Sequence, residues 1–385
     1  MPAGHRDSDA DGSSTAFKDR VDAGLVARLG EALSAAEPAF PAAAFEQRAT
    51  DGLDSLELKG RMAHVATALA ESLPDDFIRA AAVVDSVLDE LDAAERQLDG
   101  WELWPVADWV ALAGRAHPAV ALELLGRLTR YATGEFAVRP FIDDDPTGVL
   151  TRFDRWVTDG EEHRCRLVSE GTRPRLPWAS RLAVAADDPG YAVPLLDRLV
   201  GHPTEYVRRS VSNHLNDLCR VDPELGLRVA RRWTQQASAR ARPAEVDWVV
   251  KRGLRSLVKD GHPDALRLLG HDPDVAVRAE AFGITTPTVV LGGHAAWSLT
   301  LVSDDARAHR VVVDYAVHFP RADGTAGRKV FKWTTVELAA GERRTLERRH
   351  AVRPVTIRTH RPGPHLVEVQ VNGRVVASGT FDLQL

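Results

Sequence analysis

From Phe17 to Phe282, apolar residues recur three and four positions apart, which is the spacing of one buried face of a helix. The segments 24–36 (GLVARLGEALSAA), 58–73 (LKGRMAHVATALAESL) and 77–98 (FIRAAAVVDSVLDELDAAERQL) show it clearly. Short breaks such as His117-Pro118, His202-Pro203 and His262-Pro263 separate these segments. Proline suits the start of a helix, because the N–H that it lacks would have no partner there. This part of the chain is therefore predicted to be helical.

Part of the helical region repeats itself. The segments 161–171 (EEHRCRLVSEG), 204–214 (TEYVRRSVSNH) and 245–257 (EVDWVVKRGLRSL) each place His or an aromatic residue ahead of a basic, apolar run, and 274–282 (DVAVRAEAF) is a weaker copy. His163 precedes Tyr206 by 43 residues, and Tyr206 precedes Trp248 by 42. A period near 40 predicts a HEAT-like solenoid of stacked helix pairs. Glu170 and Asn213 occupy equivalent positions, so we expect both to face the concave surface.

After residue 283 the pattern changes to short runs in which apolar and polar residues alternate. Examples are 297–304 (WSLTLVSD), 310–319 (RVVVDYAVHF) and 328–338 (RKVFKWTTVEL), with turn signals at Asp323-Gly324 and Asn372-Gly373. Six or seven short strands in about 100 residues are typical of an immunoglobulin-like sandwich. The predicted fold is mostly α: a HEAT-like α-solenoid followed by an all-β immunoglobulin-like domain. The predicted domains are a disordered tail (1–16), the repeat domain (17–283) and the sandwich (284–385).

Charge divides the chain in the same place. Residues 284–385 hold 12 Arg and 2 Lys against 5 Asp and 4 Glu, a net charge of +5, whereas the whole chain carries −6. The N-terminus lacks the apolar stretch of a signal peptide, and no apolar run is long enough to span a membrane. Two cysteines, Cys165 and Cys219, argue against a disulfide framework, and the histidines show no zinc spacing. We expect a cytoplasmic protein without metal or cofactor.

Three stretches depart from ordinary solenoid helices. Residues 133–142 (TGEFAVRPFI) place Glu135 four positions before Arg139, with Pro140 expected to end that helix. Residues 167–181 (LVSEGTRPRLPWASR) combine Glu170 with arginines, a tryptophan and two backbone-breaking prolines. In 205–223 (EYVRRSVSNHLNDLCRVDP), Asp217 follows Asn213 by one helical turn. A packed helix gains nothing from these polar groups, so they indicate a functional site.

Together with 254–270 (LRSLVKDGHPDALRLLG), these stretches resemble the HEAT-like-repeat DNA alkylation repair glycosylases of the AlkC/AlkD superfamily, most closely the AlkC branch. The resemblance covers about residues 50–283, and AlkC members with an added immunoglobulin-like domain account for the remainder. It implies a monofunctional glycosylase that removes cationic alkylated bases, 3-methyladenine and 3-methylcytosine, from duplex DNA without base flipping. At 163–166 (HRCR) the family usually has His-Val-Arg-Arg, so Cys165 stands where the family has an arginine.

The chemistry of such a reaction fits the acidic residues. An N-alkylated base is already a cation and leaves without a general acid, while positive charge develops on the deoxyribose. Fixed carboxylates stabilise that charge and align the attacking water. We expect Glu170 and Asp217 to hold charge and water, with Glu135 sharing that role and Trp178 stacking at the exposed sugar or base gap.

Carboxylates repel the phosphates of DNA. A protein that places carboxylates next to DNA therefore needs cationic side chains around them. The expected partner is double-stranded alkylated DNA bound by a monomer at the nucleoid, with contacts from repeat-equivalent helix starts, the loop after Glu170 and the sandwich. The expected DNA-binding residues are Arg139, Arg173, Arg175, Trp178, Arg208, Arg209, Asn213, Lys251, Arg252, Arg255, Lys329 and Lys332.

Each of these signals has a structural alternative. Glu135 and Arg139 can form a helix salt bridge, Asp217 can pair with Arg220, and Glu170-Gly171 can be a helix end. The tryptophans of 101–109 (WELWPVADW) are predicted to pack in the core, with a loop near the substrate as the alternative. Trp233 is assigned to the core, and both cysteines are expected to be small buried residues. The alternative function is a non-catalytic HEAT-repeat scaffold that binds DNA or protein, which would tolerate loss of the acidic trio. A repeat protein for other DNA structures would keep the basic face and release no base.

Overall fold

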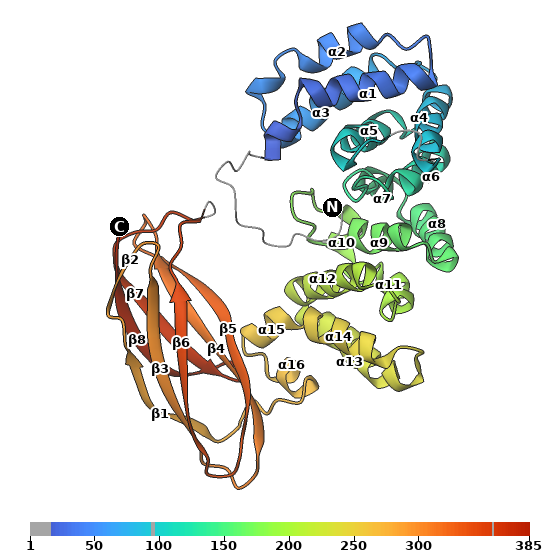
Figure 1. Ribbon diagram of the computed structural model, residues 1–385. Coiled ribbons are helices and arrows are strands. Elements are labelled where there is room, and N and C mark those ends of the chain that lie inside the picture. The colour runs from blue at the N-terminus through green and yellow to red at the C-terminus, as the bar shows by residue number, and fades with distance from the viewer. Residues whose placement is uncertain (1–16, 94–96, 356–357) are drawn as a thin grey trace. The chain divides into compact units, whose positions relative to one another are not determined.

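The computed structural model describes residues 17–93, 97–355 and 358–385, so the predicted tail 1–16 lies outside the described residues. The chain forms two compact units (Figure 1). One contains residues up to 225 together with 232–253, and the other contains 254–385 together with 226–231. None of the helices described is both long and apolar enough to cross a membrane.

The first unit is helical, as predicted. Its α-helices are α1 (Ala23–Ala36), α2 (Ala42–Thr50), α3 (Leu58–Ala70), α4 (Phe77–Asp92), α5 (Gly100–Ala113), α6 (Pro118–Leu128), α7 (Arg139–Asp144), α8 (Pro146–Asp159), α9 (Glu162–Gly171), α10 (Ala183–Asp187), α11 (Val193–Leu199), α12 (Glu205–Val221), α13 (Pro223–Gln236) and α14 (Pro243–Gly253). Short 3₁₀ helices occupy Phe17–Arg20, Leu53–Ser55 and Ala237–Ala239. The residues of helix α13 are divided between the two units, since 226–231 are grouped with the second.

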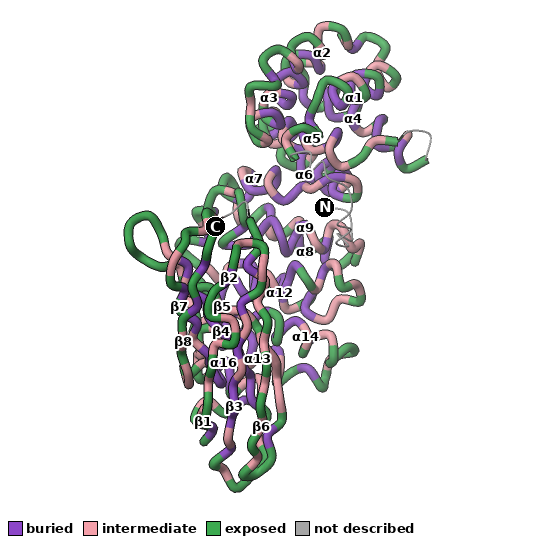
Figure 2. The backbone as a smooth tube through the Cα atoms, turned by 60° about the vertical axis from the view of Figure 1, so that its left-hand side comes forward, coloured by how far each residue is buried: buried purple, intermediate pink, exposed green. Residues whose placement is uncertain are grey.

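The repeated segments form three helices that lie side by side. Helix α12 packs against α9 on one side and α14 on the other (Figure 1). Its apolar residues Val207, Val211, Leu215 and Leu218 are fully buried, and the buried stripe runs the length of the helix in Figure 2. Because residues four apart share a helix face, this stripe fixes which other positions of α12 face outward or toward α9.

Glycine permits the closest approaches around α9 and α12. A Cβ on Gly171 would lie 2.6 Å from Val138 Cγ2, and one on Gly253 would lie 2.4 Å from Leu215 Cδ2. Gly171 ends α9, but its importance is steric, because it lets the turn before α7 approach the end of α9. That close approach brings residue 135 toward residue 170, and so positions the site.

The second unit holds the short helices α15 (Arg255–Lys259) and α16 (Pro263–Leu268) and a β-sandwich. The strands are β1 (Val277–Ile284), β2 (Thr288–Val290), β3 (His294–Ser303), β4 (His309–Pro320), β5 (Ala326–Leu338), β6 (Arg343–Ala351), β7 (Gly363–Val371) and β8 (Arg374–Gln384). One sheet has the order β1-β3-β6 and the other β2-β8-β7-β4-β5. Trp297, Tyr315 and Phe381 are buried in its core, and the predicted turns at 323–324 and 372–373 connect β4 to β5 and β7 to β8.

The helical interpretation of residues 274–282 is wrong, because most of this segment belongs to strand β1. The strand pairs antiparallel with β3, and its register shifts between Ala279 and Ala281. A β-bulge of this kind adds one residue and interrupts the alternation of apolar and polar positions. The described part of the chain therefore has eight strands where six or seven were expected, and the predicted boundary after residue 283 falls within β1.

Candidate functional site

The three predicted acidic residues come from three separate segments of the helical unit. Glu135 lies in the turn before α7, Glu170 in the last turn of α9, and Asp217 on α12. All three are buried, with exposed fractions of 7%, 7% and 6%. Burying a carboxylate is expensive unless it is paired and hydrogen-bonded, so the partners of these groups decide what they do.

Two arginines pair with the three carboxylates, and the charge of Arg166 also acts on Glu170. Arg166 binds Glu135 through both terminal nitrogens, at 2.8 and 3.2 Å. Arg173 donates from Nη1 to Glu170 Oε1 at 2.5 Å and from Nε to Asp217 Oδ2 at 2.7 Å. The predicted convergence of the trio is therefore present: a single guanidinium bridges the acids of α9 and α12.

Hydroxyl groups fix the orientation of Glu170. Ser210 on α12 donates to Glu170 Oε2 at 2.6 Å and lies 3.0 Å from the hydroxyl of Ser169. Beside them, His214 is fully buried with Nδ1 3.0 Å from the Ser169 carbonyl, and burial lowers its pKa to about 4. His214 is therefore neutral at physiological pH and adds no charge to the network. Ser210 and Asp217 are seven residues apart, two helical turns on one face, so both can reach the end of α9.

Folding shifts the pKa values of the two bridged acids, Glu170 and Asp217, in opposite directions. Burial pushes the pKa of Glu170 upward, but the positive charges of Arg166 and Arg173 and the Ser210 hydrogen bond outweigh burial, so its pKa lies below its usual value. Burial also raises the pKa of Asp217, and Arg173 offsets this only in part, so its pKa stays above its usual value. Asp217 therefore takes up a proton at a higher pH than an ordinary aspartate, and Glu170 at a lower pH than an ordinary glutamate.

The network carries more negative than positive charge. Three carboxylates against the guanidiniums of Arg166 and Arg173 leave a formal charge of −1 when all are ionised. Asp217 Oδ1 accepts no hydrogen bond from the described residues, so it can bind water or substrate. Preorganised negative charge in a poorly solvated site stabilises a cation that develops next to it. The arrangement is thus suited to a cationic transition state.

Two predicted DNA contacts are engaged elsewhere. Arg139, 2% exposed, donates to the carbonyls of Gly171, Arg173 and Ser180 at 2.9, 3.0 and 2.7 Å. Arg173 is buried in the carboxylate network. Both guanidiniums are buried and bind groups of the protein, so we assign both to the scaffold of the site. Pro140 begins α7 instead of ending a helix, and Glu135 pairs with Arg166, not with Arg139.

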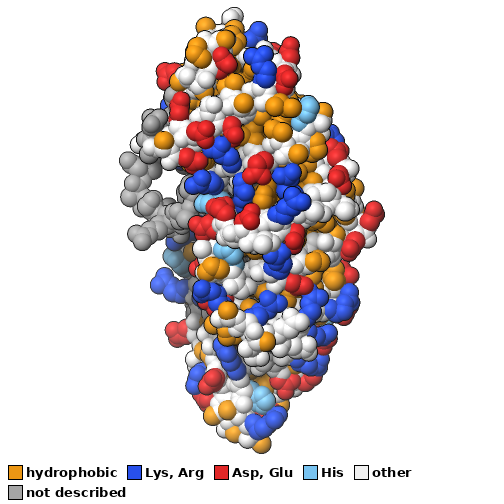
Figure 3. Space-filling model, turned by 90° about the vertical axis from the view of Figure 1, so that its right-hand side faces the viewer, with side chains coloured by type: hydrophobic (Ala, Val, Ile, Leu, Met, Phe, Trp, Pro, Cys, Tyr) orange, Lys and Arg blue, Asp and Glu red, His pale blue; other side chains and the backbone are white. Residues whose placement is uncertain are grey.

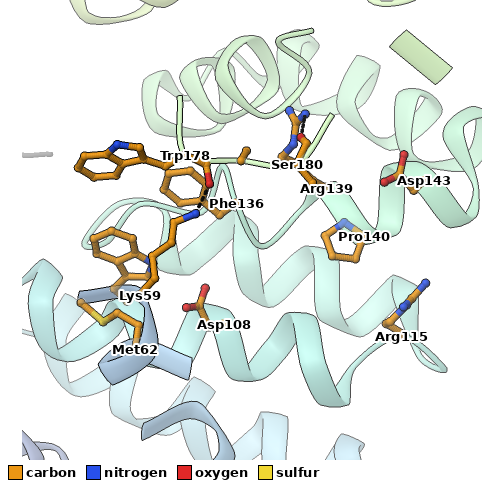
Figure 4. Close-up of a pocket in the computed structure, with 12 residues that line it drawn as sticks. Lys59, Met62, Asp108, Arg115, Phe136, Arg139, Pro140, Asp143, Trp178 and Ser180 are labelled. Carbon is orange, nitrogen blue, oxygen red and sulfur yellow. Dashed lines mark hydrogen bonds between the residues drawn. The ribbon is translucent and has the colours of Figure 1, made fainter. Parts of the chain in front are cut away.

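Trp178 has an unusual backbone. Its φ is +68°, a left-handed conformation that is strained for a bulky residue, and its side chain is 61% exposed. Lys59 donates to its carbonyl oxygen (Figure 4). Arg175, in the same loop, is exposed, and its charge acts on Asp217. The exposure and the strained backbone of Trp178, beside the cavity that contains Glu135 and Glu170, are compatible with its expected stacking role.

The remaining predicted contacts vary in exposure. Arg208 is half-buried and donates to the carbonyls of His202 and Pro203, both at 2.7 Å. Arg209 is exposed and pairs with Glu205. Asn213 is half-buried on α12, whereas Lys251 and Arg252 are exposed on α14. In the second unit Arg255 is half-buried, and Lys329 and Lys332 are exposed on β5. On the face shown in Figure 3, basic and acidic side chains are interspersed.

The sequence did not single out Arg166 or Ser210. Arg166 precedes Glu170 by one helical turn, and the coulombic effect of Glu135 and Glu170 raises its pKa against the effect of burial. A carboxylate and an arginine four apart was an available signal for it. Ser210 lies 40 residues after Glu170. This separation is close to the length of one repeat, so the repeat pattern could have placed Ser210 next to Glu170.

The tryptophans of 101–109 divide between core and surface. Trp109 is buried, as predicted, and so is Trp233. Trp101 and Trp104 are half-buried and line a cavity of about 340 Å³ that also reaches Glu135 and Glu170. Their core prediction is therefore wrong. The aromatic residues of that cavity stand next to the acidic network.

Both cysteines are free and buried, as predicted, and burial raises the pKa of Cys165 to about 11. Such a thiol is neither a nucleophile nor a phosphate contact at neutral pH. In the described ranges, no three His, Cys, Asp or Glu side chains are grouped as metal ligands.

Comparisons with known proteins agree with this fold. Residues 278–385 match the family model described as the C-terminal Ig-like domain of the uncharacterised protein YhaZ. The chain is 32% identical over 328 residues to the uncharacterized protein YhaZ of Bacillus subtilis, covering 85% of this chain and 88% of that protein. The structure of the Pseudomonas fluorescens alkylpurine DNA glycosylase AlkC, bound to DNA containing an abasic site analog, is similar with a TM-score of 0.88. That match has 32% identity and covers 96% of this chain and 100% of that one.

The similarity to the alkylpurine DNA glycosylase extends over nearly the whole chain, in both the helical unit and the immunoglobulin-like domain. The chain belongs to the AlkC branch of the HEAT-like-repeat DNA alkylation repair glycosylases.

Proposed function

We propose that this protein hydrolyses the N-glycosidic bond of cationic alkylated bases, 3-methyladenine and 3-methylcytosine, in duplex DNA and leaves an abasic site. The observation that carries the proposal is the set of buried acids held by buried arginines: Arg166 pairs with Glu135, and Arg173 bridges Glu170 and Asp217. A purely structural helical protein does not need buried carboxylates in excess over buried cations. A buried carboxylate without a cation would destabilise such a protein.

The reaction follows from these groups. The bond between C1′ and the base nitrogen breaks, and its electron pair neutralises the charge on the departing base. Positive charge passes to the deoxyribose, where Glu170 and Asp217 stabilise it. Water then attacks C1′, and its proton passes to the carboxylate of Asp217. Because the base leaves without protonation, it need not be drawn out of the helix into an acid-bearing pocket.

The nucleophile in this proposal is water, and the enzyme is monofunctional. The cations next to the trio are the guanidiniums of Arg166 and Arg173, which do not lose their protons at neutral pH and cannot form a Schiff base with the sugar. No cofactor takes part in any step. The protein is proposed to act as a monomer on a single duplex at the nucleoid.

DNA binding in this proposal uses the exposed cations near the site and on the sandwich. Arg175, Lys251, Arg252, Lys329 and Lys332 are exposed and able to reach phosphates, whereas Arg208, Arg209, Asn213 and Arg255 complete the proposed set. Affinity for DNA should then fall steeply as salt rises, because each phosphate contact releases counterions.

The proposal is tested by incubating the purified protein with duplex DNA that carries 3-methyladenine or 3-methylcytosine and detecting free bases by chromatography. Release of the free base with an intact phosphodiester backbone supports a monofunctional glycosylase. Binding of the duplex without release of any base would favour the scaffold alternative, and strand cleavage at the lesion would contradict water as the nucleophile.

Replacement of Trp178 should weaken lesion recognition. Stacking of a base on an aromatic side chain contributes about 1–3 kcal/mol, so Trp178→Gly should lower affinity for abasic or alkylated duplex by about tenfold. Glycine also relieves the left-handed backbone, so the free energy of unfolding should not fall. Fluorescence anisotropy and urea unfolding measure the two effects, and Trp178→Phe should keep most of the affinity. Unchanged affinity of Trp178→Gly for the duplex would show that Trp178 does not stack on the DNA.

The rate of base release should fall on acidification, with Asp217 setting the acidic limb. Burial raises the pKa of Asp217, so Asp217 loses its negative charge at a higher pH than an ordinary aspartate. Single-turnover release of 3-methylcytosine measured against pH should therefore decline through a pKa above the usual aspartate value. In Asp217→Asn the residual activity should lose this limb, and a limb that persists would assign it to another group.

A further inference from the structure

A second cavity, of about 390 Å³, lies in the helical unit and is lined in part by the Trp178 loop (Figure 4). It shares three aromatic residues, Trp104, Phe136 and Trp178, with the cavity that contains Glu135 and Glu170. The two spaces are therefore neighbours across an aromatic wall. Neither the proposed reaction nor the proposed phosphate contacts uses the second one.

Asp108 on α5 is directed into this cavity (Figure 4). Burial raises its pKa to about 6, against the opposing effects of Lys59 and of a hydrogen bond with Trp104. Within the described ranges no arginine or lysine forms an ion pair with Asp108, in contrast to Glu135, Glu170 and Asp217. Keeping a carboxylate so poorly solvated without a cation is unfavourable unless a ligand supplies the missing donors.

The other charged groups around the cavity already have protein partners. Lys59 donates to the carbonyl of Trp178, and Arg139 donates to three backbone carbonyls. Arg115 pairs with Asp144, and Asp143 accepts the backbone N–H of Ala183. Asp108 is therefore the acceptor in this cavity that a ligand can occupy with least competition.

The walls define the shape of that ligand. Trp104, Phe136, Pro140 and Met62 provide flat or apolar surface, and the volume lies at the lower end of the range of small-ligand pockets. Nucleobases stack on such aromatic faces whatever their sequence. An exocyclic amine that leaves water needs an acceptor for its N–H groups, and the carboxylate of Asp108 provides one.

We propose that this cavity binds a nucleobase with an exocyclic amino group, stacked along the aromatic wall and hydrogen-bonded to Asp108. The base is either an unpaired base of the DNA next to the position of Trp178 or the free base that the reaction releases. The proposal rests on the proposed function only in placing DNA at Trp178, because binding of a free base needs no turnover.

The first arm of the test measures free bases against the DNA-free protein by equilibrium dialysis. Adenine and 3-methyladenine should bind at least tenfold more tightly than purine, which lacks the amine. Asp108→Asn should lose this preference, whereas Asp143→Asn, which changes an acid of the same cavity that already has a partner, should keep it. Glu170→Gln should also keep it, so failure of the glycosylase proposal leaves this measurement intact.

The second arm uses duplexes with an abasic-site analogue opposite either adenine or unsubstituted purine. A tenfold preference for adenine that disappears in Asp108→Asn identifies the DNA base as the ligand. A preference seen only with free bases identifies the released product. If neither arm shows an amine preference that depends on Asp108, the proposed nucleobase site is overturned.

Discussion

Replacing Asp217 by asparagine is expected to lower single-turnover base release by about 100- to 1000-fold while duplex binding and folding stay close to normal. Asparagine keeps an oxygen for the hydrogen bond from Arg173 Nε but removes the negative charge and the proton acceptor. Loss of one preorganised electrostatic group and loss of a general base each have effects of this order.

Stability separates Asp217 from its neighbour. Because the folded protein raises the pKa of Asp217, folding disfavours its charged form, and a neutral side chain of the same shape should leave the free energy of unfolding unchanged or higher. The folded protein lowers the pKa of Glu170, so Glu170→Gln should lose both activity and stability. Urea unfolding at neutral pH alongside the release assay measures this difference.

The matched control is Asp154→Asn, which changes an exposed acid on α8 that pairs with Arg198. It should affect neither release nor stability measurably, since exposed ion pairs contribute about 0–1 kcal/mol. Near-normal base release by Asp217→Asn and Glu170→Gln, with duplex binding intact, would show that these acids are not catalytic. The acidic residues would then only support a DNA-binding scaffold.

The sequence predicted the parts of the fold that depend on periodicity. The stripe of Val207, Val211, Leu215 and Leu218 repeats every three or four residues over about three turns, so helix α12 and its buried face could be predicted directly. The same repeat predicted that acids of α9 and α12 would lie close together. Strand β1 was wrongly predicted as a helix because its Ala, Glu and Arg residues favour helices locally. Its actual structure is determined by pairing with β3, which includes a bulge.

The roles of individual arginines could not be predicted, because they depend on contacts between distant segments. Arg173 and Arg175 are two residues apart in one loop, yet the first is buried between carboxylates and the second is exposed. Arg139 was expected on DNA, but the carbonyls of residues 171, 173 and 180 converge on it only after the loop has folded. Charge and spacing identify such residues as functional without telling which ones contact the ligand.

Removing Arg173 should have the largest effect on stability. Arg173→Leu leaves Glu170 and Asp217 buried and without their shared cation, and breaking a buried pair in this way typically destabilises a protein by about 3–5 kcal/mol. Base release should also require a higher pH, because both carboxylates lose the positive charge that favours their ionised forms. Urea unfolding and the pH–rate profile measure these two effects.

Arg198 provides a matched control. It pairs with Asp154 at a separation of 44 residues, the same separation as between Arg173 and Asp217. Both Arg198 and Asp154 are largely exposed, so Arg198→Leu should change the free energy of unfolding by less than about 1 kcal/mol. The triple variant Arg173→Leu, Glu170→Gln, Asp217→Asn should recover much of the stability lost in Arg173→Leu, because it removes the two unpaired charges, and it should remain inactive. If Arg173→Leu proves as stable as the wild type, the carboxylates are not held by this guanidinium, and the electrostatic account of the site fails with it.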